Sequence, residues 1–359
     1  MKKIASLLLA LVLVLSLAAC GGNNGKTPAD DSKNNSGDTG TPSTPDDSTD
    51  DSAGEAELTL KFVEQLPDGH IMADTLYYFA DQVRTLSNGS IDVEVYTGGV
   101  LGDDTAMSEA IQLGTIDVCR EEFTTLVNMG AKQGIATTLP YVFRDRDHYW
   151  AVADSDVGKD LIDSIQADGT GMVGLCLVEE GARHFFANKP LNGIEDLNGM
   201  KLRVQDTEMW AAIVRALGAS PTPMSFSELY SAINSGTVEG AEQPLSGYVS
   251  NNFYEVAPYL ILDGHVYPTQ AYVISEITWN KMTDEQKAVL QEAAQLTAAY
   301  NREHIEQAEA DIMASLADLG VTVVEVADKT PWVDAMQPVY EAFGDADTLA
   351  MLERIQNVQ

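Results

Sequence analysis

Two arginines, Arg183 and Arg203, are the residues of this chain whose setting best suggests chemistry. Arg203 lies in Lys201-Leu202-Arg203-Val204, where it alternates with apolar neighbours and therefore points to one face of a partly buried strand. A guanidinium removed from water needs an acidic partner, and its fork matches a carboxylate in bidentate fashion. That partner is either the carboxylate of a bound ligand or one of the chain's own acidic side chains, and spacing alone leaves both open.

No catalytic or metal-binding motif accompanies these arginines. The chain contains no HExxH, CxxC, GxSxG or Walker sequence, no GxGxxG following a strand, and no closely spaced zinc pair among its histidines. Glu122 and His265 come from well-separated segments, which argues against a general acid–base pair. We therefore expect a protein that is not an enzyme and has no metal or cofactor. The five histidines are His70, His148, His184, His265 and His304.

The first twenty residues have the pattern of an export signal. Residues 1–3 carry positive charge, residues 4–19 form an apolar stretch too short to cross a ~30 Å hydrocarbon core comfortably, and small residues precede Cys20. Leu17-Ala18-Ala19-Cys20 resembles the bacterial lipobox, in which the cysteine is lipidated and becomes the mature N-terminus. We predict a signal peptide over 1–19 and a lipid anchor at Cys20; an ordinary signal peptide with a chance cysteine is the alternative.

The segment that follows, to residue 54, is predicted to be a disordered tether. Gly, Asn, Asp, Ser, Thr and Pro dominate it, and it contains no aromatic or large aliphatic side chain. Such a composition cannot bury enough apolar surface to offset the entropy lost on ordering. Residues 20–54 would therefore connect the lipidated cysteine to a folded part held outside the membrane.

The remaining residues, 55–359, are acidic and long enough for two lobes. Their formal charge is −31, which excludes a nucleic-acid partner because phosphate contacts need a basic surface. No apolar run approaches the ~20 residues needed to span a membrane. Cys119 and Cys176 lie in apolar segments and are expected to pack as small hydrophobic side chains, with a disulfide between them left open.

Strand-like and helix-like segments alternate along this part. Apolar residues at helical spacing over 71–86, ended by residues 87–89, predict a helix between strands at 58–65 and 91–96. This alternation is typical of a parallel sheet covered by helices, and a second such lobe is expected after residue 178. The other expected strands are 116–119, 171–178, 202–204 and 270–275, and the other expected helices are 101–114, 207–217 and 226–234.

One predicted helix is unusually long. Thr283 and Gln286 form a capping box, and helix-favouring residues continue to Leu319, before Gly320. At 1.5 Å per residue the helix would be ~54 Å long, enough to lie across two lobes. Two helices with a break near residues 300–301 are the alternative.

From Glu55 to its end the chain resembles the solute-binding component of tripartite ATP-independent (TRAP) transporters. The strongest resemblance spans residues 181–268, with GARHFF, DLNGMKLRV, LGASPTPMSFSELYSAINSGTVEGAEQP and FYEVAPYL in order, followed by His265. The upstream LGDDTAM and LPYVF sequences also fit this family. The resemblance implies an α/β, two-lobed periplasmic-binding-protein-like fold with a long helix bridging both lobes. Lobe I would comprise about 55–180 plus about 269–305, and lobe II about 181–268 plus about 306–359.

The resemblance also implies which residues bind the ligand. Arg203 is expected to anchor a ligand carboxylate, Arg183 to add a second contact, and Phe226 to pack against the ligand. Gln243 stands where the family typically has Asn, so a longer side chain occupies that place. Asp103 and Asp104 would either touch the ligand or cap a helix, and capping is favoured. The remaining expected pocket residues are Gln65, His70, Glu122, Gln205 and His265.

The function implied is capture of a small organic acid outside the cell and its delivery to a TRAP-type membrane permease. The run from Arg203 to Tyr230 and the histidine before Pro268 look more like the members that bind sugar acids, such as hexuronates or sialic acid. A C4-dicarboxylate ligand and a sensory role for the same lipid-anchored binding protein are the alternatives.

Overall fold

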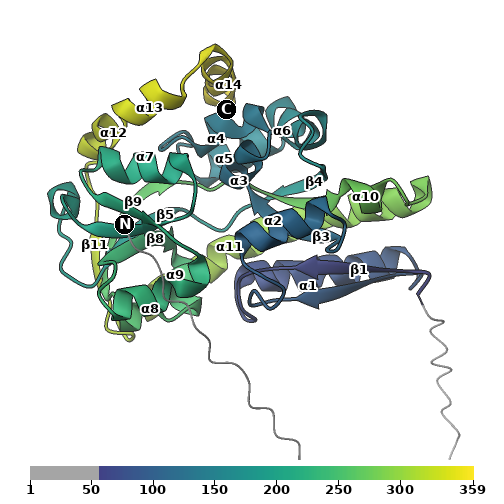
Figure 1. Ribbon diagram of the computed structural model, residues 1–359, viewed down its shortest axis with the longest axis horizontal. Coiled ribbons are helices and arrows are strands. Elements are labelled where there is room, and N and C mark those ends of the chain that lie inside the picture. Colours follow the sequence, from purple (N-terminus) through teal and green to yellow (C-terminus); the bar gives the residue numbers. More distant parts are fainter. Residues whose placement is uncertain (1–55) are drawn as a thin grey trace, which may run out of the picture. The chain divides into compact units, whose positions relative to one another are not determined.

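The computed structural model describes residues 56–359 (Figure 1). The predicted signal peptide 1–19, the lipid anchor at Cys20 and the tether 20–54 lie outside the described residues. The described part is a mixed α/β structure with two sheets, as expected. The residue bounds given above for the two lobes stay predictions.

The first sheet has five strands in the order β2-β1-β3-β10-β4. β1, β2 and β3 run parallel, as the strand–helix alternation predicts, but β10 runs antiparallel to both β3 and β4. This sheet is therefore mixed, because a strand from late in the chain returns between two early ones. Its elements are β1 (Leu58–Val63), α1 (Ile71–Leu86), β2 (Ile91–Tyr96), α2 (Asp104–Gln112), β3 (Val118–Glu122), β4 (Met172–Val178) and β10 (Gln270–Ser275).

The second sheet has six strands in the order β11-β9-β5-β8-β6-β7. β6 carries Arg203, as predicted, and α7 begins after Thr207, whose hydroxyl accepts a hydrogen bond from the Trp210 backbone N–H. The strands are β5 (Arg183–Ala187), β6 (Lys201–Val204), β7 (Ser220–Pro223), β8 (Gly240–Pro244), β9 (Tyr259–Val266) and β11 (Thr322–Glu325), with helices α7 (Glu208–Ala216), α8 (Leu229–Asn234) and α9 (Leu245–Ser250).

Shorter helices complete the described part. They pack around the two sheets, with α12, α13 and α14 forming the yellow group at the top of Figure 1. Their bounds are α3 (Phe123–Asn128), α4 (Ile135–Thr138), α5 (Arg146–Ala153), α6 (Asp156–Ala167), α10 (Glu276–Trp279), α12 (Thr330–Ala335), α13 (Gln337–Phe343) and α14 (Ala346–Asn357), and η3 (Phe226–Glu228) is a single 3-10 turn.

The long helix is continuous. α11 (Asp284–Ser315) has 32 residues, about 48 Å at 1.5 Å per residue, and the predicted capping box of Thr283 and Gln286 is present. It packs against α1 and β4 of the first sheet and against α9 beside the second (Figure 1). Asn301, where a break was the alternative, is instead buried. Its amide accepts from the Glu179 backbone N–H (2.8 Å) and donates to the Glu179 carbonyl (3.1 Å).

Apolar side chains fill the space between these elements in several buried clusters. One of these clusters includes Phe62, Phe79 and Tyr272, whose rings meet edge to face between the first sheet and α1. Cys119 and Cys176 are both buried free thiols, which confirms that they pack as hydrophobic side chains. Among the described helices none is both long and apolar enough to cross a membrane.

Candidate ligand-binding site

A cavity lies where strand ends of the two sheets face one another. The carboxyl ends of β1, β3 and β8 contribute to it, together with the residues just after β4 and β6. Residues placed beyond the carboxyl ends of strands are free of the sheet's hydrogen bonds, so their side chains can face a ligand. Its wall comprises Glu64, Gln65, Leu66, Asp104, Met107, Arg120, Glu121, Glu122, Thr125, Glu180, Arg183, Arg203, Gln205, Phe226, Gln243 and Gln270.

Three arginines lie in this wall, and Arg203 is the one whose guanidinium has no acidic partner among the described residues. Its side chain is 1% exposed, and among the described residues no carboxylate lies within 4 Å. Its Nε donates to the Met224 carbonyl (3.1 Å), whereas its buried Nη1 has no hydrogen-bond partner. Burial lowers the pKa of Arg203 to about 10, although Glu242 and Asp104 oppose the shift. A buried cation with an unused donor is suited to receive an anion from outside the chain.

Arg183 lies in the same wall, but its guanidinium is already paired. Nε and Nη2 bind the two carboxylate oxygens of Glu242, and Nη1 lies 3.6 Å from Glu122. The guanidinium also covers the Trp210 ring at 4.7 Å. Burial acts to lower the pKa of Arg183, but the charges of Glu242 and Glu122 and the hydrogen bond to Glu242 together raise it. Arg183 can therefore add a contact to a ligand only while keeping an internal ion pair.

His265 belongs to the same buried ion-pair network and not to the cavity wall. Its Nδ1 lies 2.7 Å from Asp263, its Nε2 lies 3.6 Å from Glu242, and its ring stacks on Phe185. Burial would lower the pKa of His265, but the charges of Asp263 and Glu242 raise it to about 9. His265 therefore supports Glu242 and, through it, Arg183.

A third arginine, Arg120 at the end of β3, lines the cavity and was not expected from the sequence. Its Nε and Nη2 each donate to Glu64 at 2.7 Å, and its Nη1 lies 3.5 Å from Glu180. Glu180 also accepts from Gln270 Nε2 (3.0 Å), and its other oxygen lies 3.5 Å from His70 Nε2. Burial acts to raise the pKa of Glu180, but His70 and Arg120 lower it to about 2. Arg120 is thus neutralised within the wall.

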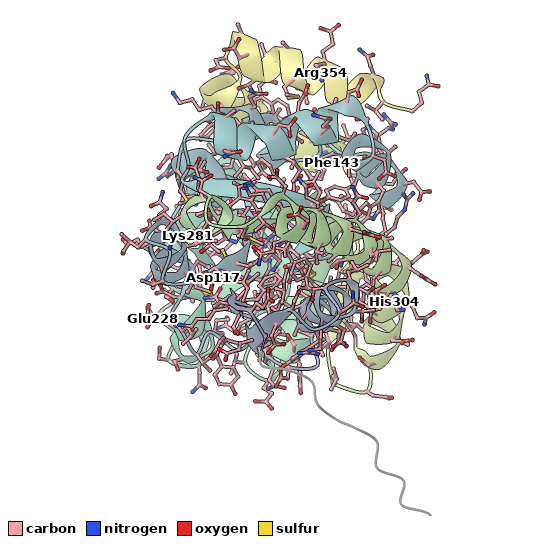
Figure 2. All side chains as sticks on the ribbon, turned by 90° about the vertical axis from the view of Figure 1, so that its right-hand side faces the viewer. Asp117, Phe143, Glu228, Lys281, His304 and Arg354 are labelled. Carbon is pink, nitrogen blue, oxygen red and sulfur yellow. The ribbon has the colours of Figure 1, made fainter. Side chains whose placement is uncertain are left out.

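His70 lies behind this cluster and is not among the lining residues. Its Nδ1 accepts from the Met72 backbone N–H (3.0 Å), which caps the start of α1. Of the other histidines, His148 contacts the Ile355 carbonyl, and His304 stacks on Tyr300 along α11, at the edge of Figure 2. Within residues 56–359 no group of three or more His, Cys, Asp or Glu side chains is placed to hold a metal ion.

Asp103 and Asp104 play different parts. Asp103 is the N-cap of α2 and accepts from the Ala106 backbone N–H (3.1 Å), as expected. Asp104 is half-buried and faces the cavity. With its amide nitrogen turned toward this carboxylate, Gln65 donates to Asp104 Oδ2 (3.1 Å). Burial raises the pKa of Asp104 to about 6, against the charges of Arg203 and Arg120.

The remaining predicted residues line the cavity. Glu122 accepts from Thr124 (2.8 Å), Gln205 (3.2 Å) and the Trp210 indole (3.3 Å), which fixes its carboxylate. The ring of Phe226 lies 5.6 Å from the Arg203 guanidinium. Gln243, near the end of β8, is buried and reaches the same wall. Nine residues were expected here, and all except His70 and His265 lie in the wall; their contacts with a ligand stay predictions.

The family described as bacterial extracellular solute-binding protein, family 7 (DctP), matches residues 62–347. The chain belongs to this family. It is 34% identical over 288 residues to the sialic acid-binding periplasmic protein SiaP of Vibrio cholerae, covering 80% of this chain and 89% of that protein. The family consists of solute-binding proteins of transport systems, so the comparison supports transport and not catalysis.

Solved TRAP solute-binding proteins share this fold. A Pseudomonas putida F1 protein with bound D-glucuronate has a TM-score of 0.81 and 30% identity, covering 84% of this chain and 97% of its own. A Sulfurospirillum deleyianum protein with bound succinate has a TM-score of 0.79 and 28% identity, covering 85% and 100%. The chain is therefore a TRAP-type solute-binding protein whose structural neighbours bind small carboxylates.

Proposed function

We propose that this TRAP solute-binding protein captures a sugar acid such as a hexuronate, and that Arg203 binds its carboxylate. The observation that carries the proposal is the buried guanidinium of Arg203, a residue of the cavity wall: its Nη1 has no hydrogen-bond partner, and no carboxylate of the described residues pairs with it. Arg120 and Arg183 are each held by a glutamate. One ligand carboxylate would therefore complete the charge pairing of the site.

The hydroxyl groups of a sugar acid would find acceptors and amides on the same wall. Gln65, Asp104, Gln205 and Gln243 line the cavity beside Arg203, and Phe226 offers a ring face. Charge-assisted hydrogen bonds contribute about 1.5–3 kcal/mol each. Two or three of them, with packing on Phe226, would give micromolar to nanomolar affinity. Arg183 would add a contact from its paired position.

We infer that the ligand-bound protein then binds a TRAP-type membrane permease. Closure of two lobes around the ligand would exclude water and strengthen the arginine–carboxylate contact. A ligand that binds the closed state better shifts the protein toward it, and the permease would recognise that state. Lipidation at Cys20 and the tether 20–54 would keep the protein beside the membrane, outside the cytoplasm.

A thermal-shift screen of the purified protein tests the ligand class. Sugar acids, C4-dicarboxylates, keto acids and neutral sugars are compared, since a ligand at 100 times its Kd stabilises the folded state by about 2.7 kcal/mol. We expect D-glucuronate or another sugar acid to raise the melting temperature of the wild type and not of Arg203→Met. A shift with neutral sugars alone contradicts carboxylate capture by Arg203.

A C4-dicarboxylate is the second candidate, because the similar Sulfurospirillum deleyianum protein has succinate bound. A second ligand carboxylate would need a second free cation. Within the lined cavity the other two arginines are already paired, and Asp104 would face the added charge. Succinate should therefore give the smaller shift, and a larger shift with succinate would reverse the order of the two candidates.

A further inference from the structure

The cavity wall contains more acidic groups than its arginines neutralise. Five acidic residues line it beside three arginines. Glu64, Glu122 and Glu180 each have an arginine nitrogen within 4 Å. Asp104 and Glu121 have no Lys, Arg or His nitrogen of the described residues within that distance. An acid ligand therefore enters a wall in which two acidic side chains lack a cation.

Glu121 is the more deeply buried of these two acids. It lies near the end of β3, is 4% exposed and lines the cavity. Asp104, in contrast, is half-buried and accepts a hydrogen bond from Gln65. An ionised carboxylate that is removed from water without a cation is unfavourable, and a buried acid avoids this by keeping its proton. Glu121 is therefore the acid of the wall for which the neutral form is most favoured.

The contacts of Ser108 on α2 indicate where that proton lies. Ser108 Oγ is 2.7 Å from Glu121 Oε1 and 2.9 Å from the Asp104 carbonyl oxygen. A hydroxyl has one hydrogen to donate, and a carbonyl oxygen only accepts. Both contacts are hydrogen bonds when Ser108 donates to the Asp104 carbonyl and Glu121 donates to Ser108. That arrangement requires a proton on Glu121 Oε1.

The groups that surround Glu121 favour the same state. The charged and titratable side chains near it are Asp104 from α2, Arg120 and Cys119 from β3 itself, and Glu64 from β1, while β10 places Ala271 opposite it. Arg120 gives Glu121 little compensation, because its guanidinium binds Glu64. Burial raises the pKa of Glu121 to about 8, and the negative charge of Asp104 acts in the same direction.

We propose that Glu121 is an uncharged carboxylic acid in the protein that binds the ligand, and that its ionisation opposes binding of an anion at Arg203. Oε2 of Glu121 makes no hydrogen bond among the described residues, and Glu121 lines the same cavity as Arg203. A negative charge on Glu121 would repel the ligand carboxylate in a space from which bulk water is largely excluded. This inference rests on the proposed function, because it requires an acid ligand. It adds Glu121 as a residue that decides whether the cavity accepts an anion.

The pH dependence of D-glucuronate binding to the purified protein tests the inference. D-Glucuronate keeps its own charge between pH 7 and pH 9, so a change in affinity over this range comes from the protein. Calorimetric titration should show an affinity about five- to tenfold lower at pH 9 than at pH 7, because Glu121 loses its proton near pH 8. At pH 8 binding should also take up about half a proton, measured by comparing buffers of different ionisation enthalpy.

Glu121→Gln separates this effect from the other groups that titrate nearby. Its amide has no charge and can donate to Ser108 Oγ as the protonated acid does. D-Glucuronate affinity of this variant should change less than about threefold from pH 7 to pH 9, and the proton uptake should disappear. Glu353→Gln on α14, an exposed acid outside the cavity, is the matched control and should keep the wild-type fall. The raised pKa of His265, about 9, lies in the same range. A fall that persists in Glu121→Gln would therefore assign the pH dependence to His265 and overturn the inference.

A measurement on the wild type without ligand tests the protonation state directly. The carbon-13 NMR signal of the Glu121 side-chain carboxyl should titrate above pH 7 in the ligand-free protein, and at higher pH with D-glucuronate bound. Titration of this carboxyl below pH 6, or a constant affinity from pH 7 to pH 9, would overturn the inference. The proposed function would stand in either case if Arg203→Met still abolishes binding. If no sugar acid binds at any pH in this range, the proposed function fails together with the inference.

Discussion

Replacing Arg203 by methionine should abolish binding of the acid ligand and also stabilise the ligand-free protein. The guanidinium is buried without a carboxylate partner among residues 56–359, and burial lowers its pKa from 12.5 to about 10. A shift of one pKa unit corresponds to about 1.4 kcal/mol, so holding the charge there costs the folded state about 3 kcal/mol. Methionine keeps the unbranched stem and removes the charge.

The substitution also removes one hydrogen bond. The bond from Arg203 Nε to the Met224 carbonyl contributes about 1 kcal/mol, and the contact with the Phe226 ring adds a little more. The net expectation is therefore a gain of about 1–2 kcal/mol in the free energy of unfolding. A residue kept for ligand binding commonly lowers stability in this way.

Denaturant unfolding of the ligand-free protein, with calorimetric titration of the acid ligand, measures both effects. Arg183→Met is the matched control. It removes the arginine partner of the buried Glu242, which keeps only the more distant His265, and should lower the unfolding free energy by about 3–5 kcal/mol. If Arg203→Met destabilises the protein as much as Arg183→Met does, Arg203 is a structural residue and the reasoning from its missing partner is wrong.

Three further predictions concern other parts of the site and fold. Because the pKa of His265 is raised from 6.5 to about 9, protonated His265 stabilises the folded state. This contribution is fully present below pH 6.5 and is lost as the pH rises to 9. His265→Gln should therefore flatten the fall in unfolding free energy over that window by about 2–3 kcal/mol, and an unchanged pH profile would exclude a protonated His265. Phe226→Ala should weaken acid binding about tenfold, less than loss of Arg203, and titration showing equal losses would argue against carboxylate anchoring as the main contribution. Asn301→Ala leaves the Glu179 backbone N–H and carbonyl buried without partners and should lower the unfolding free energy by about 2–4 kcal/mol, whereas a loss below 1 kcal/mol in denaturant unfolding would show that water replaces the amide.

The two arginines show how far the sequence could reach. Alternation with apolar neighbours correctly placed Arg203 in a buried strand. For each of the two arginines, however, the sequence did not decide whether a ligand carboxylate or an acidic side chain of the chain itself is the partner. The structure separates them, because β8 pairs with β5 and places Glu242 opposite Phe185, diagonally across from Arg183, whose guanidinium it binds. Strand register depends on contacts between distant segments, which local spacing does not specify.

The same limit explains the residues that were missed. Arg120 follows the apolar residues Val118 and Cys119, but two glutamates come after it, so it lacks the apolar neighbours on both sides that identified Arg203. Its pairing with Glu64 depends on β1 lying beside β3, so the sequence did not show that the two would meet. His265 was expected in the pocket because of its motif, yet it supports the wall from behind. The helices were easier to predict: the capping box of Thr283 and helical periodicity are local signals.

The rate at which the buried thiols of Cys119 and Cys176 are labelled can measure how often the first sheet opens. Both cysteines lie on strands that flank β10, opposite Val273 and Tyr272. Burial raises the pKa of the Cys176 thiol to about 12 and holds that of Cys119 well above its ordinary value, so neither reacts in place. In a protein whose Cys20 is replaced, the rate of thiol labelling measures how often β10 separates from its neighbours. A ligand that holds the cavity closed should slow that rate, so the native cysteines report binding without an attached probe.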